Sequence, residues 1–298
     1  MTDTETFPFT DSFARAKVNL YLHVIGRCPN GYHILDSLVA FPEIGDRVHI
    51  GKRAQGLSLS VDGPFGKGVP LDASNSLMRA ANALAEEARV TTGADIRLTK
   101  LLPVASGVGG GSADAAATLR ALMVHWNLDL PPTRVAALAL RLGADVPMCI
   151  ASQSAFVGGI GEELEPPPSL PAFSLVLVNP GVELATAAVF GVGRTSFSKP
   201  ARFSRPPADA VHFAQILAER GNDLTEAAVS LCPVIAQVLA ALSNLEDALL
   251  VRMSGSGATC FALFAEPAAA ERSAERLQQR HPDWWVAPAL VAATDNSD

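Results

Sequence analysis

A dense run of glycines near the middle of the chain is the first feature with evident chemical use. The stretch PVASGVGGGSADAA, residues 103–116, places Gly107 and residues 109–111 directly before an alanine-rich helical pattern. Glycine has no Cβ, so the backbone can turn sharply there and approach a ligand closely. If Ser112 begins the helix, exposed N–H groups and the positive helix end favour an anion in the loop. The alternative is a glycine-rich turn that only lets a strand and a helix pack tightly.

Two familiar phosphate-binding patterns do not fit this loop. A P-loop needs a lysine directly after its last glycine, and here Ser112 follows Gly111. The segment GPFGKG also fails, because Lys67 precedes its last glycine. The dinucleotide-binding fingerprint needs a third glycine where Ser112 stands, which disfavours an NAD-binding enzyme. The loop therefore predicts an anion cradle made of backbone N–H groups, and its positive charge must come from elsewhere.

The two polar residues after the glycines point to different partners. The Ser112 hydroxyl is suited to a phosphate or a metal ion. Asp114 would repel an anion, so its carboxylate either points away from the loop or lies near a bound Mg²⁺. The sequence leaves both arrangements open.

The elements that must position this loop begin with the segment FARAKVNLYLHVIG, which alternates between apolar and polar residues. A period of two predicts one strand with a buried face and a polar face. The polar face carries Lys17 beside Asn19, and Lys17 is either the missing cation or a solvated edge lysine. The Asn-Gly pair in CPNGYH predicts a turn. Tyr32 and His33 follow this turn, where aromatic rings can stack on a nucleobase.

Strands and helices alternate unevenly along the rest of the chain, which favours an α+β fold over a doubly wound sheet. Asn75 and Thr133 are predicted to cap helices that begin next to them, and Gly143 is predicted to end the second of these. GPFGKGVP is predicted to be a flexible hairpin end, KPARFSRPPADA a loop, and the proline-rich stretch near 164–171 a domain boundary. The predicted strands are 36–41, 46–52, 57–63, 95–103, 154–165, 173–181 and two flanking the turn in 248–264, and the predicted helices are 76–88, 112–126, 131–143, 232–242 and 268–280.

Composition excludes several classes of protein. The chain has 298 residues, 49% of them hydrophobic, a formal net charge of -7 and a pI of about 5.4, so a broad electrostatic grip on nucleic acid is not expected. The first ten residues lack the apolar core of a signal peptide, and no apolar run approaches the ~20 residues of a membrane helix. The 4 cysteines and 6 histidines are dispersed, which argues against a zinc site. We expect a cytoplasmic protein with no membrane partner, and its metal-binding residues stay unknown.

Three segments resemble the motifs of the GHMP kinases, the family of galactokinase and of homoserine and mevalonate kinases. The glycine loop resembles the family pattern P-x-x-x-G-[LV]-G-G-G-S-[SA], and MSGSGATCFALF resembles the third motif. RAKVNLYLHVIGRCPNGYH, together with LGADVP and NPGVELATAAVF, resembles one branch, which phosphorylates a diphosphocytidyl methylerythritol. Galactokinases and mevalonate kinases are expected to show a G-E-H first motif, absent here, and homoserine kinases lack NGYH.

This resemblance implies an enzyme, a small-molecule kinase that uses ATP and Mg²⁺. It implies a two-domain α+β fold, with residues 1–164 as the N-terminal ATP-binding domain and 165–298 as the C-terminal kinase domain. ATP and the substrate are expected in the cleft between the domains, and the 2-hydroxyl of the methylerythritol unit is the expected acceptor in non-mevalonate isoprenoid precursor synthesis. Open alternatives are another GHMP acceptor, of the homoserine or mevalonate type, and a non-catalytic nucleotide-binding member. We expect a monomer or a weak homodimer.

The resemblance also implies roles for single residues in phosphoryl transfer. Asp145 is the expected base that takes the hydroxyl proton, although an aspartate before Pro147 is also typical of an Asx turn. Lys17 is the expected catalytic cation. The expected ATP-binding residues are Pro103, Val104, Ala105, Ser106, Gly107, Val108, Gly109, Gly110, Gly111, Ser112 and Ala113.

The remaining roles concern the substrate and the third motif. The resemblance implies that Tyr32 and Phe190 sandwich the cytosine and that His33 reads its edge, while a partly buried packing role is the alternative for each. Asn19 is expected to hydrogen-bond the substrate, and Thr186 to contact a phosphate or the ribose. Gly255, Ser256 and Gly257 are expected to shape the loop beside the phosphates, and the alternative is a plain hairpin turn.

Overall fold

In the computed structural model the described residues are 10–104, 106–193 and 196–295, and they fall into two compact units. Unit 1 runs up to Arg15 and includes Gly45–Val104 and Gly110–Ala151. Unit 2 holds Ala16–Ile44, the segment that ends at Gly109, and the chain from Ser152 onward. Each unit is thus assembled from separate stretches of the sequence. The predicted boundary between residues 164 and 165 stays a prediction.

Unit 1 contains one four-stranded sheet in the order β1-β4-β6-β5. Its strands are β1 (Thr10–Arg15), β4 (Gly45–Arg53), β5 (Leu57–Asp62) and β6 (Gly93–Thr99). β5 and β6 pair in parallel, because the chain between them crosses over through a helix. The expectation that GPFGKGVP is a hairpin end is therefore wrong, since a hairpin joins antiparallel strands.

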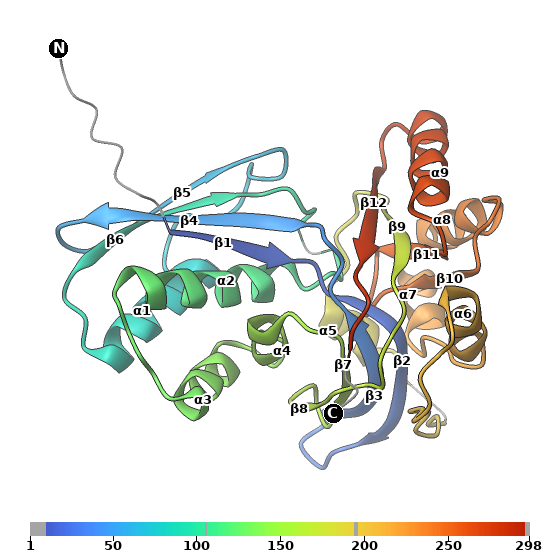
Figure 1. Cartoon of the computed structure of the whole chain (residues 1–298), viewed down its shortest axis with the longest axis horizontal. Coiled ribbons are helices and arrows are strands. Elements are labelled where there is room, and N and C mark those ends of the chain that lie inside the picture. Colours follow the sequence, from blue (N-terminus) through green and yellow to red (C-terminus); the bar gives the residue numbers. More distant parts are fainter. Residues whose placement is uncertain (1–9, 105, 194–195, 296–298) are drawn as a thin grey trace. The chain divides into compact units, whose positions relative to one another are not determined.

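Four helices of unit 1 are α1 (Ser76–Ala88), α2 (Gly110–His125), α3 (Pro132–Leu142) and α4 (Val146–Ala151), and α1 and α2 cover one face of the sheet (Figure 1). The Asn75 side chain accepts a hydrogen bond from the Leu77 N–H at 2.8 Å, so the predicted cap is confirmed. The prediction for Thr133 is wrong. Pro131 occupies the N-cap of α3 without a side-chain cap, and Thr133 lies inside the helix. Gly143 ends α3 as predicted.

Unit 2 contains two sheets, ordered β2-β3-β7-β8 and β10-β11-β9-β12. The strands of the first are β2 (Val18–Arg27), β3 (His33–Ala40), β7 (Ala155–Gly158) and β8 (Glu163–Glu165). Those of the second are β9 (Phe173–Asn179), β10 (Leu250–Met253), β11 (Cys260–Phe264) and β12 (Trp285–Val291). The helices are α5 (Thr186–Gly191), α6 (Ala210–Ala218), α7 (Thr225–Leu231), α8 (Val234–Ser243) and α9 (Pro267–Arg280).

The central strand β9 explains why its sequence is a continuous apolar run. Leu175 and Leu177 pack in a core with β2, β3 and α6, whereas Val176 and Val178 pack in a second core with α8 and α9. Figure 1 shows α9 beside β12, at the edge of this sheet. Both faces of β9 are therefore covered, and no polar alternation is needed.

The segment that alternation predicts as one strand is two strands in different units. β1 ends at Arg15 and belongs to unit 1, while β2 begins at Val18 and belongs to unit 2. The predicted polar face of β2 is also buried, with Tyr21 fully inaccessible. The prediction of one half-exposed strand is wrong, because tertiary packing covers both faces. The polar groups on the second face find internal partners instead.

The KPARFSRPPADA segment contains neither helix nor strand up to Asp209, as predicted. It is nevertheless fixed to β3. The buried Asp36 carboxylate accepts hydrogen bonds from the Ala201 N–H at 2.7 Å and from Arg202 Nε at 3.0 Å. Arg202 also pairs with Glu165. In the part of the chain that the structure describes, no helix is long and apolar enough to cross a membrane.

We expect substitutions at Asn75 and at Thr133 to have different effects on the free energy of unfolding. Asn75→Ala removes a bond to the Leu77 N–H and another to the Pro70 carbonyl, so the free energy of unfolding should fall by about 1 to 2 kcal/mol. Thr133→Ala should change it by no more than about 0.5 kcal/mol, because this exposed side chain caps nothing. Urea unfolding followed by circular dichroism measures both, and equal losses would contradict the assignment of the caps.

Candidate functional site

The glycine loop and the third-motif turn lie against each other within unit 2. Gly107 has a φ of +77°, in the left-handed region, and a Cβ built on it would lie 2.2 Å from the Gly257 carbonyl oxygen. Backbone atoms cannot yield as a flexible side chain can, so only glycine fits at this position. Gly109, with a φ of +68°, approaches the aliphatic part of Lys17 closely.

A threonine that the sequence did not single out holds this contact. Thr259 directly precedes β11 and is fully buried. Its hydroxyl donates to the Ser106 carbonyl at 2.6 Å, and its backbone N–H reaches the same oxygen at 3.2 Å. The amide of Asn179 donates to the Thr259 hydroxyl at 3.0 Å. Two donors therefore fix the carbonyl that precedes the first glycine of the loop.

Lys17 and Asn19 belong to a buried polar network on the same framework. The Lys17 N–H donates to the Val108 carbonyl at 2.8 Å, which ties the start of β2 to the glycine loop. Lys17 Nζ donates to Asn19 Oδ1 at 3.1 Å, and Lys17 is only 8% exposed, so the solvated edge lysine is ruled out. The Asn19 amide donates to Ser37 Oγ at 2.8 Å, and the Asn19 N–H to Ser254 Oγ at 3.1 Å. The expected cation and its neighbour are thus held rigidly.

In unit 1 the loop continues into α2, which begins at Gly110 and not at Ser112 as predicted. The backbone reaches helical geometry two residues earlier because glycines 110 and 111 adopt it themselves. The first turn of a helix has N–H groups without intrahelical acceptors, and these favour an anion. At the other end of the predicted loop, Pro103 is buried and Val104 exposed, while Ala105 lies outside the described residues.

Asp114 points to a lysine rather than into an anion site. Lys100 Nζ donates to Asp114 Oδ2 at 2.8 Å and to Asp46 Oδ2 at 2.5 Å, and all three residues are buried. Asp46 Oδ1 also accepts the N–H groups of Leu101 and Leu102, which lead into the loop. Asp114 Oδ1 is buried without a hydrogen-bond partner. The cluster connects β4, β6 and the second turn of α2.

Burial dominates the electrostatics of this cluster. It raises the pKa of Asp114 to about 7, with Lys100 opposing the rise and Asp46 adding to it. Burial lowers the pKa of Lys100, but the two carboxylates outweigh it and the net shift is upward. The Asp114 carboxyl is therefore easier to protonate than an ordinary aspartate.

Asp145 lies directly before α4 in unit 1, half-buried, and its carbonyl accepts the Cys149 N–H at 3.2 Å. Lys17 belongs to unit 2, so the two predicted catalytic residues come from different units. Each of the two residues is adjacent to a regular element: Asp145 directly precedes α4, and Lys17 directly precedes β2.

The residues predicted to bind the substrate form two contacts within unit 2. The rings of His33 and Phe190 lie 5.3 Å apart, tilted by 32°. Thr186 Oγ1 lies 2.9 Å from Ser256 Oγ, which links α5 to the third motif. Tyr32 is 61% exposed, and a ring in water has area to offer a stacking partner.

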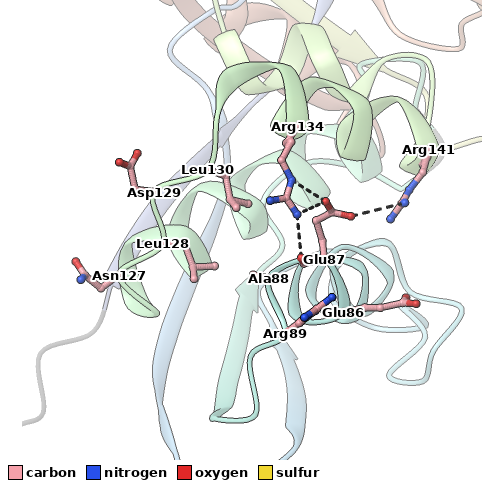
Figure 2. Close-up of a pocket in the computed structure, with 10 residues that line it drawn as sticks. All are labelled: Glu86, Glu87, Ala88, Arg89, Asn127, Leu128, Asp129, Leu130, Arg134 and Arg141. Carbon is pink, nitrogen blue, oxygen red and sulfur yellow. Dashed lines mark hydrogen bonds and ion pairs between the residues drawn. The ribbon is translucent and has the colours of Figure 1, made fainter.

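A pocket of about 650 Å³ also lies in unit 1, between the end of α1 and the α2–α3 connection (Figure 2). None of the predicted site residues lines it. Figure 2 shows Arg134 and Arg141 turned toward Glu87, and both form ion pairs with its carboxylate. Among the described residues, no three carboxylate, histidine or cysteine side chains gather into a metal-binding group.

Comparison with known proteins decides the family. The GHMP kinases N terminal domain matches residues 75–153, and the GHMP kinases C terminal domain matches residues 208–283. The chain is 51% identical to the 4-diphosphocytidyl-2-C-methyl-D-erythritol kinase of Paramagnetospirillum magneticum, over 93% of this chain and 97% of that one. The chain belongs to the GHMP kinase family. Its relatives place it in the branch of 4-diphosphocytidyl-2-C-methyl-D-erythritol kinases.

Solved GHMP kinases agree with the fold. A crystal structure of 4-(cytidine 5'-diphospho)-2C-methyl-D-erythritol kinase has a TM-score of 0.77 and 33% identity, covering 95% of this chain and 99% of that one. A homoserine kinase from Cytophaga hutchinsonii has a TM-score of 0.72 but 16% identity, covering 99% and 98%, and shows the fold alone. The predicted α+β GHMP kinase fold is confirmed.

Substitution of two glycines to alanine tests how tightly the backbone packs around Gly107 in this GHMP kinase, with Gly68 as the reference. Gly107→Ala should lower the free energy of unfolding by roughly 2 to 6 kcal/mol, because backbone strain and the clash with Gly257 add. Gly68 has a φ of +87° with nothing within 4 Å of a built Cβ, so Gly68→Ala should cost only about 1 kcal/mol. Chemical denaturation of both variants gives the comparison, and similar costs would show that the loop has space to yield.

The Asp114 cluster predicts a pH dependence of stability. The pKa of Asp114 is higher in the folded chain than its ordinary value of 3.8, so its protonated form favours folding. That contribution is complete below pH 4 and is lost as pH rises to about 7, with a slope of at most about 1.4 kcal/mol per pH unit. Asp114→Asn should remove this slope. Denaturation of both proteins at pH 5, 6, 7 and 8 measures it, and parallel curves would contradict the shift.

Proposed function

We propose that this chain transfers the γ-phosphoryl group of ATP to the 2-hydroxyl of 4-diphosphocytidyl-2-C-methyl-D-erythritol, a step in non-mevalonate isoprenoid precursor synthesis. One observation carries the proposal. Relatives 44% to 51% identical, over 93% to 98% of this chain, bear the name of that kinase. The retention of Lys17 and Asp145 favours an active enzyme over a non-catalytic member of the fold.

The glycine loop suits the phosphates of ATP. Gly107 and Gly109 hold left-handed conformations and carry no side chain of their own, and α2 starts directly after Gly109. We assign the described residues of the predicted set, Pro103, Val104 and 106–113, to the phosphate cradle. When bound, ATP supplies the phosphoryl group, and the helix N–H groups bind the negative charge of its phosphates.

Two side chains are proposed to act on the acceptor hydroxyl. Asp145 accepts its proton, a role that suits a carboxylate fixed at a helix start. Lys17 stabilises negative charge on the transferred group, because phosphoryl transfer depends mainly on positioning and charge. The bonds of Lys17 to Asn19 and Val108 hold the ammonium in one place before the substrate binds.

We propose that the cytosine binds at Tyr32, His33 and Phe190. The pairing of His33 with Phe190 supports one aromatic wall, and the exposed ring of Tyr32 is suited to the opposite one. Asn19 is proposed to hydrogen-bond the substrate, and Thr186 to bind a phosphate or the ribose next to Ser256.

We propose that Mg²⁺ enters with ATP and is held largely by phosphate oxygens. Mg²⁺ commonly binds through one or two carboxylates plus the phosphates of its substrate and keeps several waters. The cytoplasmic location and the monomer or weak homodimer stay predictions.

A panel of phosphate acceptors tests the proposed substrate. With ATP and Mg²⁺, we expect ADP release with the diphosphocytidyl compound and no comparable release with mevalonate, homoserine or galactose. A coupled assay for ADP, with product identified by mass spectrometry, measures this. Turnover of another acceptor would reassign the substrate, and no turnover with any acceptor would support the non-catalytic alternative.

Two variants test the proposed catalytic residues. Asp145→Asn and Lys17→Ala should each lower kcat by about 10² to 10⁴-fold, since each removes a group that acts in the transition state. The exposed Asp129→Asn and Lys67→Ala variants are the matched controls and should keep normal kcat. Circular dichroism confirms that all four fold. Normal kcat in the Asp145 variant would exclude it as the base.

A further inference from the structure

We propose that Asn179 and Thr259 are positioning residues for phosphoryl transfer, which together fix the start of the glycine loop. This inference rests on the proposed kinase function but concerns two residues to which the motifs assigned no role. Neither side chain is expected to touch ATP or the acceptor. Each acts through the Ser106 carbonyl, the last polar group before the run of glycines.

The strand register places the two residues opposite each other. β9 and β11 pair antiparallel, with Cys260 opposite Val178 and the ladder continuing from there. Asn179 is the next residue of β9 and Thr259 the residue before Cys260, so the pair stands at the open end of the ladder. Residues in such cross-strand positions have fixed separations, because the sheet sets them.

The side-chain hydrogen-bonding groups of Thr259 and Asn179 are buried and already have partners. Thr259 is fully buried and Asn179 only 1% exposed. The Thr259 hydroxyl accepts from Asn179 and donates to Ser106, so both of its capacities are used. The other end of the Asn179 amide accepts the Gly181 N–H at 2.8 Å, in the turn that leads to α5. Asn179 therefore orders the approach to Thr186 and Phe190 and, through Thr259, the glycine loop.

The loop depends on an external anchor because Val108 is buried but the glycines on either side of it have no side chain to pack. Glycines lose more backbone entropy on ordering than any other residue, and they carry no side chain to pack. Donors aimed at developing charge are effective only when they are fixed before the reaction. A misplacement of about 1 Å can cost on the order of 10² in rate. Two donors on one carbonyl supply that anchor at Ser106.

The central experiment compares three threonine variants. Thr259→Val keeps shape but removes donor and acceptor, and Thr259→Ser keeps the hydroxyl. Thr118→Val is the matched control: Thr118 is also fully buried, and its hydroxyl bonds the Asp114 carbonyl at 2.8 Å inside α2. Measured are the melting temperature, kcat and KM for ATP, the Kd for ADP by calorimetry, and amide hydrogen exchange of residues 107–109.

We expect Thr259→Val to weaken ADP binding about tenfold and to lower kcat about tenfold. Amide exchange in the loop should also be faster. The reason is that valine cannot make the buried hydrogen bonds of the Thr259 hydroxyl to Ser106 and Asn179. Thr259→Ser should restore all three. Thr118→Val should lower the melting temperature alone. Asn179→Ala, which leaves the bond from Thr259 to Ser106 in place, should give a smaller loss, and it substitutes for Thr259→Val if that variant does not fold.

Two outcomes would overturn the inference. One is unchanged kcat, Kd and exchange in Thr259→Val despite a lower melting temperature, as in the control. The other is a Thr259→Ser variant as impaired as Thr259→Val. Failure of the proposed function is distinguishable, since the unaltered protein would then turn over no acceptor. In that case ADP affinity and loop exchange would still decide the positioning role.

Discussion

The structure of unit 2 depends on one close approach between two backbones, at Gly107 and Gly257. The carbonyl of one lies where a Cβ on the other would stand. This constraint excludes a side chain at position 107. Val108 is buried next to it, but Gly107 and Gly109 have no side chain that packing could hold in place. The rest of the local architecture supplies that order from outside.

The order comes from buried hydrogen bonds. Thr259 binds Ser106, Lys17 binds Val108 through its backbone, and Ser254 binds Asn19. Burying so many polar groups is costly unless each finds a partner, and here the partners come from segments that are distant in the sequence. The network therefore specifies one arrangement of loop, turn and β2. Fixed donors and a fixed cation are what a charge-stabilising catalyst needs.

In unit 1 a buried cluster of charged residues holds the backbone that leads into the glycine loop. Lys100 bonds two carboxylates, one of which also holds the backbone that leads into the glycine loop. Burial raises the pKa of Asp114 to about 7, with Lys100 opposing the rise and Asp46 adding to it. The carboxyl is therefore partly protonated near neutral pH, which reduces the negative charge near the helix end that we assign to phosphate.

Local features were predictable from sequence because their causes are local. Asn75 caps α1 by accepting the N–H of a residue two positions later, Gly143 ends α3, and the glycine spacing predicted the loop. Resemblance to GHMP kinases then supplied the family. The predicted cap at Thr133 failed because Pro131 already sets the start of α3. Helix α2 began earlier than expected because neighbouring glycines are compatible with helical geometry.

The sequence by itself determined the motifs, the kinase family and the apolar strands, since these follow from residue type and short-range spacing. Only the tertiary structure decided that Arg15 and Ala16 belong to different units, that Asp114 points to Lys100, and that Thr259 anchors Ser106. Ser106 and Thr259 are separated by 153 positions. No local pattern encodes such a contact, because it exists only once the folded chain has brought the glycine loop and the third-motif turn together.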